Sequence, residues 1–235
     1  MTSVERPSRQ TTGGPPLGIL AVVFTALFLG GVIVSTAMAG AAFPSPFGSS
    51  AGILAYFHDH RKAVEVGAFL QFAASVPMAI FAATVSARLH NLGIRAPGAT
   101  IALVGGTLAA AMLTFSALFS WVLSRPEVLT EPAALRALHY LAFVTGGPGH
   151  VVFLGLLVAG IAVPGWLAGL LPRPLAFTGL AIALLAEVCT LTLLVSGAAI
   201  LLPIARFTAL AWLIATGFLL PRTRIKMQSS KDTLT

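Results

Sequence analysis

Charged side chains are scarce in this chain, since Asp, Glu, Lys and Arg make up only 9% of its 235 residues. A soluble domain carries roughly 25% of such residues. Hydrophobic residues instead reach 57%, and the mean hydropathy is +0.94. This balance excludes a large soluble core and predicts a membrane protein whose main partner is the lipid bilayer. The net charge of +7 does not indicate a nucleic-acid partner, because the basic residues stand singly or in pairs between apolar runs.

Cysteine is nearly absent, since Cys189 is the only one. A lone cysteine cannot form an internal disulfide, and no zinc-ligand spacing is present. The chain also lacks the G-x-S-x-G, H-E-x-x-H, Walker A and G-x-G-x-x-G patterns. Haem ligation by two histidines is disfavoured, because only His150 is expected at mid-depth of a span. We therefore predict no metal, no cofactor and no catalytic residues.

Long apolar runs are what the chain has in abundance. Crossing the hydrocarbon core takes about 20 apolar residues, and six segments qualify. The predicted fold is an all-α bundle of six transmembrane helices, which follows an N-terminal tail (1–16) and precedes a basic C-terminal tail (222–235). The predicted spans are 17–40, 64–87, 98–123, 138–162, 175–195 and 201–220.

The basic residues predict the direction of these spans. With both termini inside, nine of the 14 Lys and Arg residues fall on the inner side and five on the outer side. Inner loops of membrane proteins carry such an excess, so both tails are predicted to be cytoplasmic. The first span has one alternative, a signal peptide cleaved after "AMA". Its apolar run of 17–34 exceeds the usual length of roughly 7–15 residues, which favours a retained span.

Two ionisable residues are expected near the middle of neighbouring spans, His150 in the fourth and Glu187 in the fifth. Ionisable groups at this depth cost about 3 kcal/mol even on the gentler insertion scales, so they normally face the interior of a bundle. The two antiparallel helices place both groups at matching depth. We therefore predict a midplane site for a proton or a ligand at His150 and Glu187, with a hydrogen-bonded pair that fixes helix register as the alternative.

The stretch "VTGGPGHVV" puts poor helix formers directly before His150. Proline lacks the N–H that a regular helix needs, and glycine makes the backbone soft. A carbonyl freed in hydrocarbon must find a partner, so the break should face protein or a wet cavity. We predict either a binding or gating point or a simple packing kink at Gly146, Gly147, Pro148 and Gly149.

A second cluster of polar residues is expected on the outer side of the membrane. "AGILAYFHDHRKAVE" reads as an interfacial helix that runs into the second span, with Ile53, Leu54 and Phe57 on one side. A metal between the two histidines of "HDH" is disfavoured, because residues two apart on a helix point about 200° apart. The predicted outer cluster comprises His58, His60, Glu65, His139 and Arg206.

Small residues recur every fourth position in the third span, from Gly98 through Ala102 and Gly106 to Ala110. A shorter stripe in the fifth span contains Gly179 and Ala183. Such stripes let membrane helices approach closely, so we interpret them as packing surfaces of a tight bundle. A stripe that faces a second copy of the chain, or another membrane protein, remains an open alternative.

The second half of the chain carries three recognisable stretches, "GGPGHVVFLGLLVAGIAVPG", "LLPRPLAFTGLAIALLAE" and "ALAWLIATGFLLPR". With its glycine-rich fourth span and its Pro-Arg turn into a small-residue fifth span, the chain resembles a family of small bacterial six-span integral membrane proteins of unknown function. The resemblance extends over residues 17–221. It implies a six-helix bundle in the bacterial inner membrane, and it implies no activity and no site residues.

Two functional hypotheses follow. The first is a small proton-linked carrier or channel-like protein whose midplane site contains His150 and Glu187. The second is a non-catalytic membrane partner or sensor subunit, held by the small-residue stripes and the basic tail. An enzyme is disfavoured, because no catalytic set is visible in the sequence.

Overall fold

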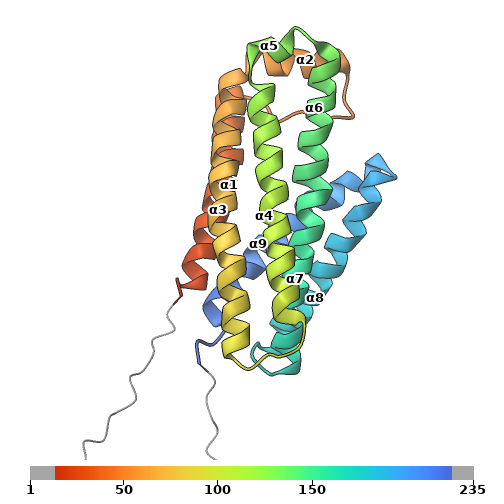
Figure 1. Cartoon of the computed structure of the whole chain (residues 1–235). Coiled ribbons are helices and arrows are strands. Elements are labelled where there is room, and N and C mark those ends of the chain that lie inside the picture. The colour runs from red at the N-terminus through yellow and green to blue at the C-terminus, as the bar shows by residue number, and fades with distance from the viewer. Residues whose placement is uncertain (1–13, 224–235) are drawn as a thin grey trace, which may run out of the picture.

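The computed structural model describes residues 14–223, and all regular structure within that range is helical (Figure 1). Six of its helical runs are long and apolar enough to cross a membrane. The predicted all-α bundle of six spans is therefore confirmed. Both described ends lie at one end of the bundle, which we call the terminal end. At the opposite or capped end, the short helices α2 (Ser50–Asp59) and α5 (Pro126–Leu129) lie across the bundle.

The spans follow the predicted segments closely. The third span agrees with its prediction at both ends, whereas the second and fourth extend several residues past their apolar cores. The extra turns at the ends of these two spans contain polar residues, so a prediction based on hydropathy alone does not include them. The spans are α1 (Leu17–Ala39), α3 (Arg61–Asn91), α4 (Gly98–Leu123), α6 (Pro132–Val144) continued by η1 (Thr145–Gly149) and α7 (His150–Leu167), α8 (Arg173–Val188) continued by η2 (Cys189–Leu193), and η3 (Ser196–Ile200) continued by α9 (Leu201–Leu219).

Small residues allow α4 and α7 to pack backbone against backbone. A Cβ atom built on Gly105 would lie 2.5 Å from the backbone nitrogen of Leu157. A Cβ built on Gly160 would lie 2.4 Å from the backbone nitrogen of Ala102. Neither position has room for a side chain, because its neighbour is main chain that cannot rotate away. These two glycines therefore fix the distance between the central helices of the bundle.

The predicted small-residue stripes are used inside the single chain. Gly98 lies against Pro164 of α7, and Gly106 lies against Ala82 of α3. In α8, Gly179 lies against the indole ring of Trp212. Close packing of this kind is the main attraction between helices in lipid. The stripes therefore explain the cohesion of one chain, and they do not indicate an interface with a second copy.

The sequence predicted that the interfacial helix at the capped end runs without interruption into the second span. Instead, His60 leaves the helical conformation (φ −119°, ψ 27°) and separates α2 from α3. Because of this bend, Ile53 and Phe57 are buried in a small cluster with Leu123 and Leu135. The bend lets α2 lie over the bundle while α3 enters it, so the interfacial helix is a packed cover.

We expect Gly105→Ala and Gly160→Ala to lower the free energy of unfolding by about 1–3 kcal/mol each, because overpacking a core forces its backbone to shift. The measurement is an SDS titration in mixed micelles followed by tryptophan fluorescence. The matched control is Gly30→Ala in α1, where an added Cβ meets open space. Equal stability of all three variants would show that α4 and α7 are not in backbone contact.

Candidate functional site

At the position of the predicted break, the fourth span forms one turn of π-helix over Thr145–Gly149. Gly147 has a non-helical backbone (φ −85°, ψ −105°), and Pro148 has no N–H to donate. The N–H of His150 is directed to the carbonyls of Thr145 and Gly147. In a regular helix it would bond to the carbonyl of Gly146. The break therefore offers the Gly146 carbonyl to a partner from another helix.

That partner is Arg206, which projects from the second turn of α9. A terminal N–H of its guanidinium donates to the Gly146 carbonyl. The guanidinium carbon also lies 5.2 Å from the centre of the Phe28 ring in α1, in a cation–π contact. The Nε atom is buried and has no hydrogen-bond partner among the described residues. Arg206 thus joins three spans and keeps unused donor capacity.

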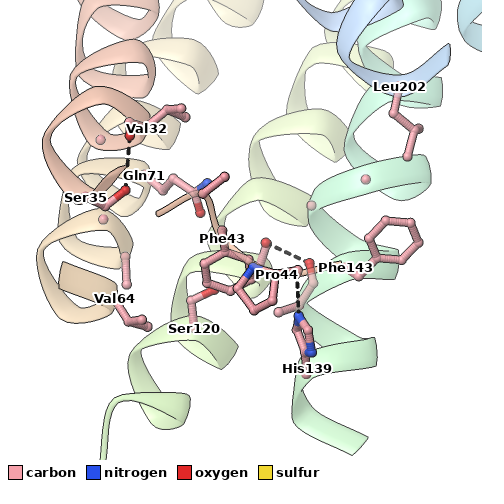
Figure 2. Close-up of a pocket in the computed structure, with 18 of the residues that line it drawn as sticks. Val32, Ser35, Phe43, Pro44, Val64, Gln71, Ser120, His139, Phe143 and Leu202 are labelled. Atoms are coloured by element: carbon pink, nitrogen blue, oxygen red, sulfur yellow. Dashed lines mark hydrogen bonds between the residues drawn. The ribbon is translucent and has the colours of Figure 1, made fainter. Parts of the chain in front are cut away.

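Arg206 lines a cavity of about 380 Å³ between α1, α3, α4, α6 and α9 (Figure 2). The depth of the cavity follows from the direction of the chain. The lining residues farthest from the capped end of their helices are Phe28, Gln71, Gly147 and Arg206. The walls are mostly apolar, and no Asp or Glu is among the lining residues. The polar side chains that line the cavity are Ser35, Thr36, Gln71, Ser116, Ser120, His139 and Arg206.

A strap formed by residues 42–46 covers the cavity at the capped end. The Nε2 atom of His139 lies 3.1 Å from the carbonyl oxygen of Pro44 (Figure 2). Because a carbonyl only accepts, this nitrogen carries the proton and donates. Phe43 packs edge-to-face on His139 (ring centres 5.6 Å apart) and on Phe57 (5.5 Å). His139 therefore holds the strap by one hydrogen bond and one aromatic contact.

On the terminal side of Arg206 the bundle is filled by large buried side chains. Phe24 of α1 and Phe81 of α3 meet edge-to-face with their ring centres 5.6 Å apart, and both are fully buried. His150 is 1% exposed, and its Nδ1 donates to the carbonyl of Ala109 in α4 at 2.9 Å. The cavity is thus covered by the strap toward the capped end, and buried aromatic side chains pack together on its terminal side.

The predicted His150–Glu187 pair is not formed. His150 uses its ring to bond α4, while the side chain of Glu187 is exposed on the outer face of α8. The reason is the register of α8, because the helix turns Ala183 and Ala186 toward Gly155 of α7. Successive residues on a helix are about 100° apart, so the residue after Ala186 leaves that contact. Small-residue packing therefore sets the register of α8, and this register turns the Glu187 carboxylate away from α7.

The predicted outer cluster divides into three separate places. His139 and Arg206 line the cavity. Glu65 lies outside it and forms ion pairs with basic side chains of α3 and of the α4–α5 turn. His58 and His60 stay at the end of α2, where His58 contacts Asp59 at 3.0 Å. Across residues 14–223, no group of three or more His, Cys, Asp or Glu side chains is arranged to hold a metal ion.

Sequence reasoning missed most of the cavity lining. Ser35, Gln71, Ser116 and Ser120 come from three spans, and no spacing in the sequence connects them. Arg206 did carry a signal, because an arginine inside an apolar span is a functional residue by default. Its position close to the start of the sixth span places it in the predicted outer cluster, whereas the structure places it in the cavity.

The arrangement can bind an anion. A guanidinium presents five N–H donors in a planar fork that matches carboxylate, sulfonate and phosphate oxygens. The Ser120 hydroxyl on the same cavity wall adds a weaker donor, whereas the hydroxyls of Ser35 and Ser116 donate to backbone carbonyls of their own protein. The aromatic walls suit an apolar portion of a ligand. Comparison of the chain with protein-family models, with curated proteins and with solved structures finds no match.

We expect His139→Phe to loosen the strap, because phenylalanine keeps the aromatic packing and removes the hydrogen bond. The hydrogen bond is partly buried, and a typical intramolecular hydrogen bond contributes about 0.5–1.5 kcal/mol. A water-soluble maleimide should therefore label Ser120→Cys several-fold faster in the His139→Phe variant, with both measured in a Cys189→Ser background. The matched control is His58→Phe, because His58 is exposed and lies outside the cavity. Unchanged labelling in His139→Phe would show that the bond does not hold the strap.

Proposed function

We propose that this multi-pass membrane protein is a carrier for small organic anions, with Arg206 as the anion-binding residue. The observation that carries the proposal is an arginine inside a membrane cavity that contains no carboxylate to neutralise it. An arginine at the centre of a membrane helix costs about 2.5–3.5 kcal/mol on insertion scales. A structural role for Arg206 needs only one of its five donors, whereas a ligand uses the others.

The ligand class follows from the walls and from the volume. A cavity of about 380 Å³ is near the lower end of the usual range for small-molecule sites. Phe28, Phe43 and Phe143 supply aromatic surface, and Ser120 supplies a hydroxyl group. This combination suits a compact anion with an aromatic or short aliphatic body. A neutral ligand of the same shape would leave the guanidinium unneutralised.

Transport requires a second state in which the cavity faces the terminal end. The π-helical turn at Gly147 is the natural hinge, because its backbone bonds already depart from the regular pattern. Arg206 holds the hinge through the Gly146 carbonyl. An anion that engages the guanidinium therefore acts on the residue that fixes the hinge, which couples ligand binding to the shape of the fourth span.

We do not propose proton coupling, because that hypothesis required contact between His150 and Glu187. His150 instead bonds Ala109, and Glu187 is exposed. We propose the predicted topology, with both tails cytoplasmic, since the sequence has an excess of basic residues in its predicted inner segments. A bacterial inner membrane is proposed as the location, and the resemblance of residues 17–221 to a bacterial six-span family supports it.

We expect benzoate to bind the purified protein more tightly than its neutral analogue benzamide, as measured by isothermal titration calorimetry in detergent. Hydrogen bonds to charged groups contribute about 1.5–3 kcal/mol. Arg206→Gln should therefore weaken benzoate binding roughly 10- to 100-fold and leave benzamide binding unchanged. The affinity of Arg206→Lys for benzoate should lie between those of the wild type and Arg206→Gln, because lysine keeps the charge but loses the fork geometry.

The matched control is Arg136→Gln. Arg136 is a nearby cation of α6 that contacts Ser50 and Tyr140 and does not line the cavity. Its replacement should leave benzoate binding unchanged. Equal binding of benzoate and benzamide to the wild-type protein would contradict an anion site.

Proteoliposome efflux of benzenesulfonate separates a carrier from the second hypothesis. This anion stays charged at all working pH values, so it does not cross lipid as a neutral acid. A carrier should release it several-fold faster than protein-free vesicles do, and Arg206→Gln should abolish the difference. Benzoate binding without efflux would overturn transport and favour the non-catalytic partner or sensor subunit, in which the same cavity detects a ligand.

A further inference from the structure

A second concave surface lies outside the bundle, between α3 and α4 at the capped end. This groove has a volume of about 510 Å³ and shares only Ala68 with the cavity lining. The groove is therefore separate from the cavity, and its exposed residues Phe69, Phe72 and Leu118 place it on the outer surface of the bundle. Its lining residues are Lys62, Glu65, Val66, Ala68, Phe69, Phe72, Ala117, Leu118 and Trp121.

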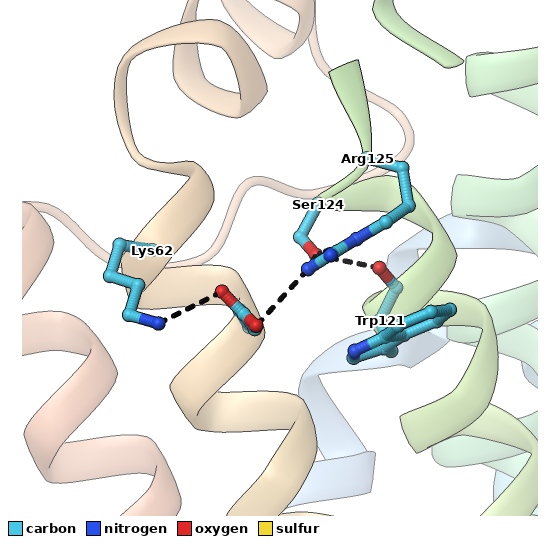
Figure 3. Close-up of polar contacts among 5 residues, drawn as sticks. Lys62, Trp121, Ser124 and Arg125 are labelled. Atoms are coloured by element: carbon cyan, nitrogen blue, oxygen red, sulfur yellow. Dashed lines mark hydrogen bonds and ion pairs between the residues drawn. The ribbon is translucent and has the colours of Figure 1, made fainter. Parts of the chain in front are cut away.

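The end of the groove nearest the capped end is charged (Figure 3). Glu65 bridges two cations, with its carboxylate oxygens 3.1 Å from the Lys62 amine and 3.3 Å from the Arg125 guanidinium. The Arg125 guanidinium also lies 4.4 Å from the centre of the Trp121 ring and donates to Ser124. Two cations share one carboxylate, so the cluster keeps one positive charge.

The rest of the groove is apolar and faces outward. Phe69 is 67% exposed, and Phe72 and Leu118 are also exposed. Because the groove begins in the first turns of α3 and at the last turns of α4, its charged end lies at the level of the membrane interface. Tryptophan and basic residues are typical of that level. The groove therefore changes from charged to apolar along the direction in which a lipid changes from headgroup to acyl chain.

We propose that this groove binds one anionic glycerophospholipid from the leaflet at the capped end. The headgroup oxygens contact Lys62 and Arg125, and one acyl chain lies along Phe69, Phe72 and Leu118. The surplus positive charge selects an anionic headgroup over a zwitterionic one, because Glu65 neutralises only one of the two cations. Glu65 also holds both cations in place before the lipid arrives. This site is independent of the anion cavity and of the function proposed for it.

The experiment is native mass spectrometry of the full-length, delipidated protein incubated with equal amounts of dioleoyl phosphatidylglycerol and dioleoyl phosphatidylcholine. The wild-type protein should retain one phosphatidylglycerol in preference to phosphatidylcholine. A basic residue near the surface changes the affinity for anionic lipid by about fivefold. The preference should therefore fall about fivefold in Lys62→Gln and further in the Lys62→Gln/Arg125→Gln double variant.

Two controls keep the outcome interpretable. The Lys62 side chain is 74% exposed, so its replacement tests charge without disturbing the fold. Arg95→Gln removes an exposed cation from the opposite end of the bundle and should leave the preference unchanged. Phe69→Ala should reduce the retention of both lipids and keep their ratio, whereas Phe207→Ala on the exposed face of α9 should change neither.

Three outcomes would overturn the proposal. One is equal retention of the two lipids by the wild-type protein. Another is a phosphatidylglycerol preference that survives the double variant or falls equally in Arg95→Gln. The third is a lipid-free dimer, which would show that a second copy of the chain occupies the groove.

Discussion

The contact between Arg206 and the carbonyl of Gly146 is the constraint around which the cavity is arranged. A membrane interior offers no water to a freed backbone group, so each break in a span needs a partner from the protein. The "GGPG" sequence creates such a break, and Arg206 of the sixth span supplies the partner. The same contact fixes the sixth span against the fourth and gives an arginine a place at membrane depth.

The cavity is a consequence of that arrangement. Small residues bring α4 and α7 into backbone contact, whereas the region above Arg206 is bounded by α1, α3, α4, α6 and α9 and is left open. A strap held by His139 covers this opening, and aromatic packing closes the opposite half. The cavity therefore lies in the capped half of the bundle, and the terminal half is filled by side chains. The guanidinium stands at the boundary between the two.

Several features could be predicted because they depend on neighbouring residues alone. Apolar runs of sufficient length identified all six spans, and Pro148 with its flanking glycines located the break. The site itself could not be predicted in this way. Ser35, Gln71, Ser116 and Ser120 meet across three helices, and their convergence depends on how each helix is rotated about its axis. The same rotation turned Glu187 outward and left His150 bonded to Ala109.

The sequence by itself determined that the chain has six helices long and apolar enough to cross a membrane, that its helices pack through small residues and that its fourth span is broken. These properties follow from hydropathy, side-chain volume and missing backbone donors, which are local. Only the tertiary structure decided that Arg206 reaches the break, that His139 holds a strap and that Glu65 bridges two cations outside the bundle. Contacts between distant residues depend on helix register, and in this bundle the close approach of glycines and alanines sets that register.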